Sequence, residues 1–352
     1  MSPPKVLLTG ATGYIGVTIL NQLVTSEAES LRDLTISLPV RGEDRAAKLK
    51  NKYGGRIVRQ CGVWLPPSKR RGNGAWSGPA QGHDRPAHWM IHTSGCSNIS
   101  DRPLMGTAHP DREWDDAEAE AVYEFEKVDN ARVVPAAGIG AARPRHEPQG
   151  RRRGAQHPGL QRLWRGGGPV PGRRRHDPHH DRLRPGAGHG FALGDGAGAI
   201  IYVHVSGLAA LYVRCVRRIV EDGGRDLPRR RAGILFPANG RTTMQDIARR
   251  CVGAAFDYGV LPRNDEGPRD REVRTVDLDE AATTTVGNRV VAEVGCARHR
   301  LTKGTAARKL GWESTRGQEA WAQNFRDELR AALAEKSGVA MGNCINEAAG
   351  DP

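Results

Sequence analysis

Residues 5–16 read Lys5-Val-Leu-Leu-Thr-Gly-Ala-Thr-Gly-Tyr-Ile-Gly16, and this stretch decides the fold class. Its apolar start predicts a short buried strand over 6–9, and the spacing of the apolar residues after the turn predicts a helix over 14–24. The glycines between them have the spacing G-x-x-G-x-x-G. The first two permit a tight turn close to a pyrophosphate, and the third lets helix and strand pack. The residues expected to bind a dinucleotide here are Gly10, Thr12, Gly13, Tyr14, Ile15 and Gly16.

The next segment continues the alternation of strand and helix. We expect a second strand over 34–40, a charged helix over 43–53 and the start of a third strand over 56–58. Strands that alternate with helices are typical of a parallel sheet with helices on its faces. The sequence therefore predicts an α/β fold with a doubly wound parallel sheet of the Rossmann type.

Arg41 follows the second predicted strand, at the point where a bound dinucleotide would place its adenine ribose. An acid there suits the free ribose hydroxyls of NAD, whereas an arginine suits a 2′-phosphate. We therefore predict NADP as the cofactor, with Arg41 as one of its ligands and NAD as the alternative. A solvated arginine at the start of a loop is the other explanation for Arg41.

The net charge of +13 is concentrated in two basic windows, residues 59–88 and 132–190. The second window holds thirteen arginines and three acids, and both windows are rich in Gly and Pro. Neither has a helical or strand period, and the second has too few aliphatic residues for a central strand. A structureless insert of this length inside a compact domain is unusual.

Two explanations account for the basic windows. They could be a nucleic-acid-binding arm or a disordered regulatory insert. The second window lacks lysine and interleaved aromatic residues, which argues against nucleic acid. Alternatively, both windows are out-of-frame or intronic translation of GC-rich coding DNA, and the chain is the inactive product of a damaged gene.

Regular elements return outside the windows. A strand is predicted over 89–94 and a helix over 115–130. From residue 192 onward we expect strands over 199–205 and 233–237, and helices over 208–221, 242–256, 305–310 and 318–336, with Thr242 or Thr243 as an N-cap. The domains are accordingly 1–191 for the dinucleotide, 192–336 for the rest of the sheet and a small substrate subdomain, and 337–352 as a flexible tail.

Tyr123 and Lys127 lie four residues apart on the predicted helix over 115–130. This spacing puts the phenol and the ammonium group on one face. The lysine charge would lower the pKa of the tyrosine and fit it for acid–base chemistry. The alternative is that both residues are surface side chains of the helix with no catalytic role.

The strand over 89–94 runs into a turn with several hydroxyl groups. Ser94 and Ser97 are the candidates for orienting a substrate carbonyl or alcohol, with Thr93 third, and the sequence does not choose between the two serines. The alternative role is capping of the strand end and its loop.

These motifs and their order resemble the short-chain dehydrogenase/reductase superfamily, and most closely its extended or atypical branch, the NAD-dependent epimerase/dehydratase and NmrA-like proteins. Two later runs add to the resemblance. Residues 194–209 contain Gly-Asp-Gly and then Tyr-Val-His-Val-Ser-Gly-Leu-Ala, with Gly207 where the family usually has Asp. Residues 307–312 read Ala-Arg-Lys-Leu-Gly-Trp, similar to a C-terminal helix end of the family.

The resemblance implies an NAD(P)-dependent oxidoreductase, or a sugar-like epimerase or dehydratase, that acts on a carbonyl or alcohol of a small metabolite. Tyr123 would be the general acid/base. Lys127 would lower its pKa and bind the nicotinamide ribose, and Ser94 or Ser97 would polarise the carbonyl. The alternative from the same family is a non-catalytic NmrA-like NAD(P) sensor. The family's adenine-side Asp and its strand with a Pro-containing loop would fall inside the basic windows, where nothing matches them.

Other features exclude some classes of protein. The six cysteines contain no C-x-x-C pair, which argues against a zinc site and against a disulfide framework, so we expect no metal and a reducing compartment. The sequence shows neither a signal peptide nor an apolar run long enough to span a bilayer. We therefore expect a cytoplasmic protein with a small-molecule substrate, with neither a membrane nor nucleic acid as partner, and with a homodimer as one option.

Overall fold

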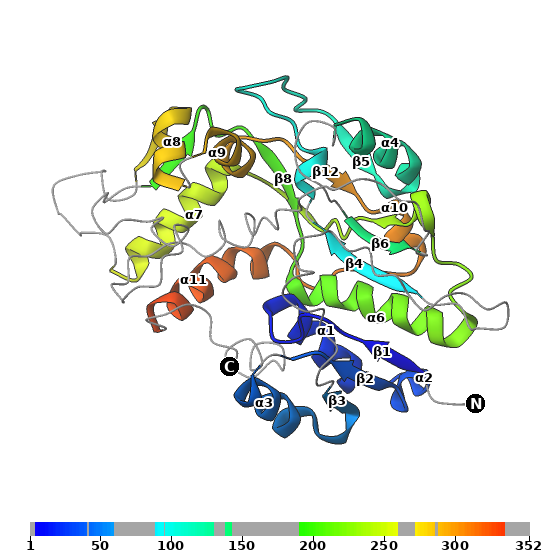
Figure 1. Ribbon diagram of the computed structural model, residues 1–352. Coiled ribbons are helices and arrows are strands. Elements are labelled where there is room, and N and C mark those ends of the chain that lie inside the picture. Colours follow the sequence, from blue (N-terminus) through cyan, green and yellow to red (C-terminus); the bar gives the residue numbers. More distant parts are fainter. Residues whose placement is uncertain are drawn as a thin grey trace, which may run out of the picture.

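The computed structural model describes residues 4–40, 42–59, 89–94, 96–129, 138–142, 190–259, 272–285 and 288–334. This part of the chain is mixed α/β, with short sheets and helices packed against them (Figure 1). Within the described ranges no helix combines the length and the apolar character that crossing a bilayer requires.

The N-terminal segment forms the predicted β-α-β-α-β unit. It consists of β1 (Lys5–Leu7), α1 (Tyr14–Thr25), β2 (Thr35–Leu38), α3 (Glu43–Tyr53) and β3 (Ile57–Arg59), with a short helix α2 (Glu29–Arg32) before β2. The strands pair in parallel in the order β1-β2-β3, with Val6 opposite Ile36 and Ile36 opposite Ile57. The α/β prediction is confirmed for this unit, and α3 has the predicted bounds.

A second sheet contains β4 (Met90–Ser94), β6 (Gly138–Ala142) and β9 (Ile234–Leu235). Both of its pairings are antiparallel, and β6 is the central strand. The expectation that the window 132–190 holds no central strand was therefore wrong for 138–142. The strand exists because backbone hydrogen bonds to two neighbours define it, and these do not require aliphatic side chains.

The remaining strands form two-stranded pairs. β5 (Glu113–Asp115) pairs in parallel with β12 (Leu301–Lys303), and β7 (Gly190–Leu193) with β11 (Val273–Val276). β8 (Ala199–Tyr202) pairs antiparallel with β10 (Gly240–Thr243). Of these, only the strand at β8 was expected from the sequence.

The other helices are α4 (Ala119–Asp129), α6 (Val205–Asp222), α7 (Met244–Asp257), α8 (Leu278–Thr285), α9 (Arg289–Cys296), α10 (Thr305–Lys309) and α11 (Gln318–Ala334). Helix α6 begins three residues before its predicted start because His204 caps it, with Nδ1 accepting from the Ser206 N–H. The same cap ends β8 earlier than predicted. Thr243 is the N-cap of α7, as expected, and its hydroxyl accepts from the Asp246 N–H at 3.1 Å.

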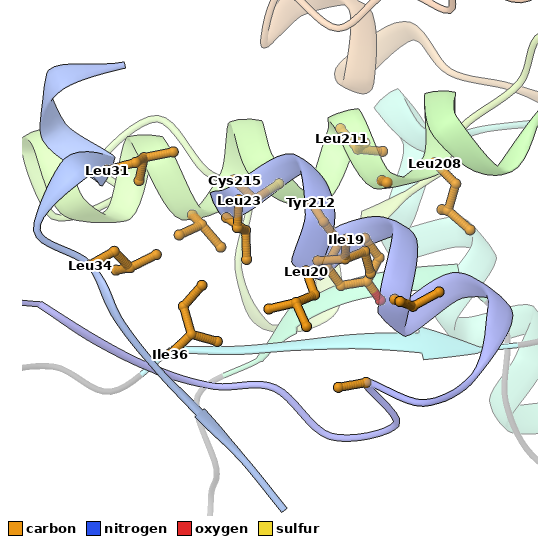
Figure 2. Close-up of a cluster of buried hydrophobic side chains, with 14 of the residues drawn as sticks. Ile19, Leu20, Leu23, Leu31, Leu34, Ile36, Leu208, Leu211, Tyr212 and Cys215 are labelled. Carbon is orange, nitrogen blue, oxygen red and sulfur yellow. The ribbon is translucent and has the colours of Figure 1, made fainter. Parts of the chain in front are cut away.

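The largest hydrophobic core joins α6 to the N-terminal unit. Figure 2 shows Leu23 of α1 next to Cys215 of α6, and Leu20 of α1 on the side of Ile36 of β2. Leu211 of α6 belongs to the same cluster. All five side chains are buried. Full burial of a Leu or Ile side chain contributes about 1.5–3 kcal/mol, so this interface is a main source of stability for the glycine turn that precedes α1.

Candidate functional site

The glycine turn between β1 and α1 has the geometry that its spacing predicts. Gly10 has φ +72°, a left-handed conformation that L side chains rarely adopt. The Gly13 N–H donates to the Gly10 carbonyl at 2.9 Å and closes the turn. A β-carbon on Gly16 would lie 2.1 Å from that same carbonyl oxygen, so this position accepts only glycine. The turn is therefore as tight as the predicted pyrophosphate-binding turn requires.

The surface of the turn is open where a ligand would approach. Gly10 and Gly13 are exposed, whereas Ala11 and Gly16 are buried beneath them. Helix α1 starts directly after Gly13, which provides no side-chain cap, and its first turn contains no acid. An anion at this helix end would meet a favourable dipole and no repelling carboxylate.

Thr12, Tyr14 and Ile15, the other predicted cofactor ligands, are half-buried in this turn. Arg41, predicted to bind the 2′-phosphate, lies outside the described residues. Its neighbour Gly42 has φ +86° and precedes α3.

The hydroxyl groups after β4 differ in their surroundings. The Ser94 hydroxyl is buried and has no hydrogen-bond partner in the part of the chain that the structure describes. Thr93 shares a hydrogen bond with the phenol of Tyr212 on α6, and burial raises the pKa of Tyr212 to about 12. Ser97 is half-buried in the 3₁₀ turn Cys96–Ile99. Of the two serines that the sequence left open, Ser94 has the hydroxyl that is buried without a partner among the described residues.

Tyr123 and Lys127 both lie on α4, as predicted, but each contacts a different residue. The Tyr123 ring packs against the buried cluster that contains Ile99 and Phe236, and the Arg231 guanidinium carbon lies 5.3 Å from its centroid. The Lys127 Nζ lies 3.4 Å from Glu124 Oε2, and its side chain is 60% exposed.

Helix α4 contacts the 3₁₀ turn that contains Ser97, so the structure brings the helix of Tyr123 next to the hydroxyl turn. The glycine turn belongs to the separate core that joins α1 and α6. In Figure 1, α4 lies above β4 and β6, and α1 lies below them.

Glu126 on α4 is a titratable residue that the sequence analysis missed. One of its carboxylate oxygens is buried, and no described residue forms a hydrogen bond with it. Burial raises the pKa of Glu126 to about 7. Its position three residues after Tyr123 was the only available signal, and an acidic residue on a charged helix is too common to single out.

No family model matches the chain, and a search of curated proteins finds no match either. The function is therefore inferred from the residues and their geometry.

Proposed function

We propose that the chain is an NAD(P)-dependent oxidoreductase of the short-chain dehydrogenase/reductase type, acting on a carbonyl or alcohol of a small metabolite. Epimerisation or dehydration through transient oxidation belongs to the same proposal. The observation that supports it is the contact of Gly16 with the Gly10 carbonyl, at a turn whose outer glycines are exposed. Such a turn, between a parallel strand and a helix N-terminus, suits a pyrophosphate.

In this proposal the β1-β2-β3 sheet is the nucleotide-binding half of a doubly wound sheet, and residues 192–336 include a small substrate subdomain. NADP is the proposed cofactor, with NAD as the alternative, because Arg41 follows β2. The cofactor would supply the hydride. The protein's part is to hold the carbonyl and to give or accept the proton on its oxygen.

Ser94 and Tyr123 would divide that work. The unpartnered Ser94 hydroxyl is free to donate to a carbonyl oxygen, and Ser97 is the second choice. Tyr123 would transfer the proton, and Lys127 would bind the nicotinamide ribose. Because Tyr123 lies beneath Arg231 and Lys127 pairs with Glu124, both side chains would have to leave these partners for catalysis.

A non-catalytic NAD(P)-sensing protein is the second candidate. The contacts of Tyr123 with Arg231 and of Lys127 with Glu124 favour it. A sensor needs the glycine turn but not a Tyr–Lys pair. In the described structure Tyr123 and Lys127 are engaged in packing and in a surface ion pair that stabilises little.

Isothermal titration calorimetry of the purified chain with NADPH and, separately, with NADH tests the proposal. We expect saturable binding, tighter for NADPH, and loss of that binding in Gly16→Ala. Gly253→Ala is the matched control, because a β-carbon there meets nothing within 4 Å. If neither nucleotide binds to folded protein, both candidates fail, and an inactive product of a damaged gene becomes the better explanation.

A further inference from the structure

Residues 298–300, between α9 and β12, are fixed in place on two sides. On one side the His299 N–H donates to Asp101 Oδ1 at 2.6 Å. On the other the Arg300 N–H donates to the Ala199 carbonyl at 2.7 Å, and the Arg300 carbonyl accepts from the Ile201 N–H at 3.2 Å. The segment is therefore a rigid connection to β8, and the side chains that it carries start from a defined backbone.

Two arginines of this segment are buried together. Arg298 is 2% exposed and Arg300 is 7% exposed. Arg300 Nη2 donates to the Ile201 carbonyl at 3.0 Å, whereas Arg298 Nε and Nη2 are buried and find no hydrogen-bond partner among the residues that the structure describes. Arginines are rarely this buried unless they are paired, because the loss of hydration strongly disfavours an isolated charge.

The charge of Asp101 raises the pKa of Arg298, but among the described residues neither Asp101 nor the buried Glu293 forms an ion pair with either arginine. Asp101 uses one oxygen for the His299 N–H and the other for the His109 N–H, at 2.6 Å each. Glu293 is fully buried and accepts two backbone N–H bonds with Oε1, while its Oε2 has no partner within the described ranges. Across the ranges that the structure describes, no carboxylate forms an ion pair with Arg298.

The arginine pair lies beside the hydroxyl turn after β4. Cys96, the first residue of the 3₁₀ turn, is close enough to act electrostatically on both Arg298 and Arg300. Ser94, two residues earlier, also has a buried hydroxyl with no hydrogen-bond partner among the described residues. Burial and the neighbouring Arg300 lower the pKa of Arg298 to about 9, so the guanidinium still carries its charge at neutral pH.

We propose that Arg298 and Arg300 form an oxyanion-binding site that takes the carboxylate or phosphate group of a small molecule. The unpartnered Nε and Nη2 of Arg298 suit the oxygens of such a group, whose negative charge would add to that of Asp101. The proposal goes beyond the proposed function and does not depend on it, because the anion binds whether or not a nucleotide does.

Calorimetric titration of the full chain with inorganic phosphate and, separately, with acetate tests this site. Chloride at matched ionic strength controls for general screening. We expect saturable binding of at least one of the two oxyanions, and the tighter one identifies the ligand group. Arg298→Met should weaken that binding at least tenfold, and Arg298→Lys should restore part of it. Arg249→Met, at an exposed position on α7, should bind like the wild type.

Thermal unfolding gives a second readout that does not need high affinity. The oxyanion should raise the melting temperature of the wild type but not that of Arg298→Met. Without oxyanion, Arg298→Met should melt at or above the wild-type temperature, because an unpaired buried charge has been removed. The proposal is overturned if neither oxyanion binds the wild type, or if Arg298→Met binds and is stabilised as the wild type is.

Discussion

The indole N–H of Trp312 donates a 2.7 Å hydrogen bond to the carbonyl of Gly207. The two residues are 105 positions apart and belong to the sequence runs 194–209 and 307–312. Trp312 is only 2% exposed and lies in the same core as α1 and α6. The end of α10 is thereby tied to the start of α6.

Replacing Trp312 by Phe should lower the free energy of unfolding by about 2–4 kcal/mol. The change removes a buried hydrogen bond and leaves a cavity where the larger ring was. Denaturant unfolding followed by circular dichroism measures it, and Leu104→Ala, at a side chain that is 48% exposed, is the control. A loss below about 0.5 kcal/mol would show that the surroundings repack without this contact.

Gly16→Ala should lower stability as well as nucleotide affinity. The new methyl group would overlap the Gly10 carbonyl, and the backbone would have to shift at a cost of about 1–3 kcal/mol. Chemical denaturation compares Gly16→Ala on α1 with the control Gly253→Ala on α7. The control measures the general effect of adding a methyl group to a helix, so the difference between the two variants measures the strain. Equal stability of the two variants would contradict the close approach.

Glu126 predicts a pH dependence of stability. Its pKa is about 7 in the folded protein, against 4.5 for the ordinary side chain, so the folded state holds this proton more tightly. Protonated Glu126 therefore adds to the free energy of unfolding. This contribution is complete below pH 4.5 and is lost as the pH rises from 4.5 to 7. After allowance for solvent screening we expect a loss of about 1–2 kcal/mol over that range.

Glu126→Gln should flatten this part of the stability curve, since an amide does not titrate. Urea unfolding of both proteins at pH 4.5, 5.5, 6.5 and 7.5 provides the comparison. An unchanged slope in the variant would assign the pH dependence to other groups.

Tyr123→Phe separates the two proposed functions. An enzyme should keep NADPH binding and lose at least about 100-fold in turnover, because general acid–base catalysis contributes about that much. A sensor should keep both its nucleotide affinity and its partner binding. Steady-state assays over a panel of carbonyl substrates, run beside calorimetry, distinguish these outcomes. Glu120→Gln, at an exposed position on the same helix, is the control.

The sequence was sufficient for elements whose pattern is local. Helix α3 and the glycine turn follow from periodicity and from glycine spacing, and Thr243 follows from capping chemistry. Short strands such as β5 and β12 were missed because three residues carry no period. They exist through pairing between distant segments, such as Thr302 opposite Trp114.

The candidate site was predictable to a smaller extent. Glycine spacing marks Gly16, but no local signal shows that the Ser94 hydroxyl lacks a partner or that Tyr123 packs beneath Arg231. No pattern in the sequence indicates that Arg298 and Arg300 are buried together. Each of these depends on neighbours that only the folded chain brings close.

The packing of α1 against α6 has a consequence for biosynthesis. Gln22 Nε2 of α1 donates to the Ser206 carbonyl of α6 at 3.0 Å, across 184 positions of sequence. During translation the ribosome must add those residues before the apolar face of α1 meets its partner, which takes roughly 10–40 s at ordinary elongation rates. In that interval the newly made helix exposes its leucines. Chaperone binding to the nascent N-terminal segment should therefore decline once residue 222, the end of α6, has left the ribosome.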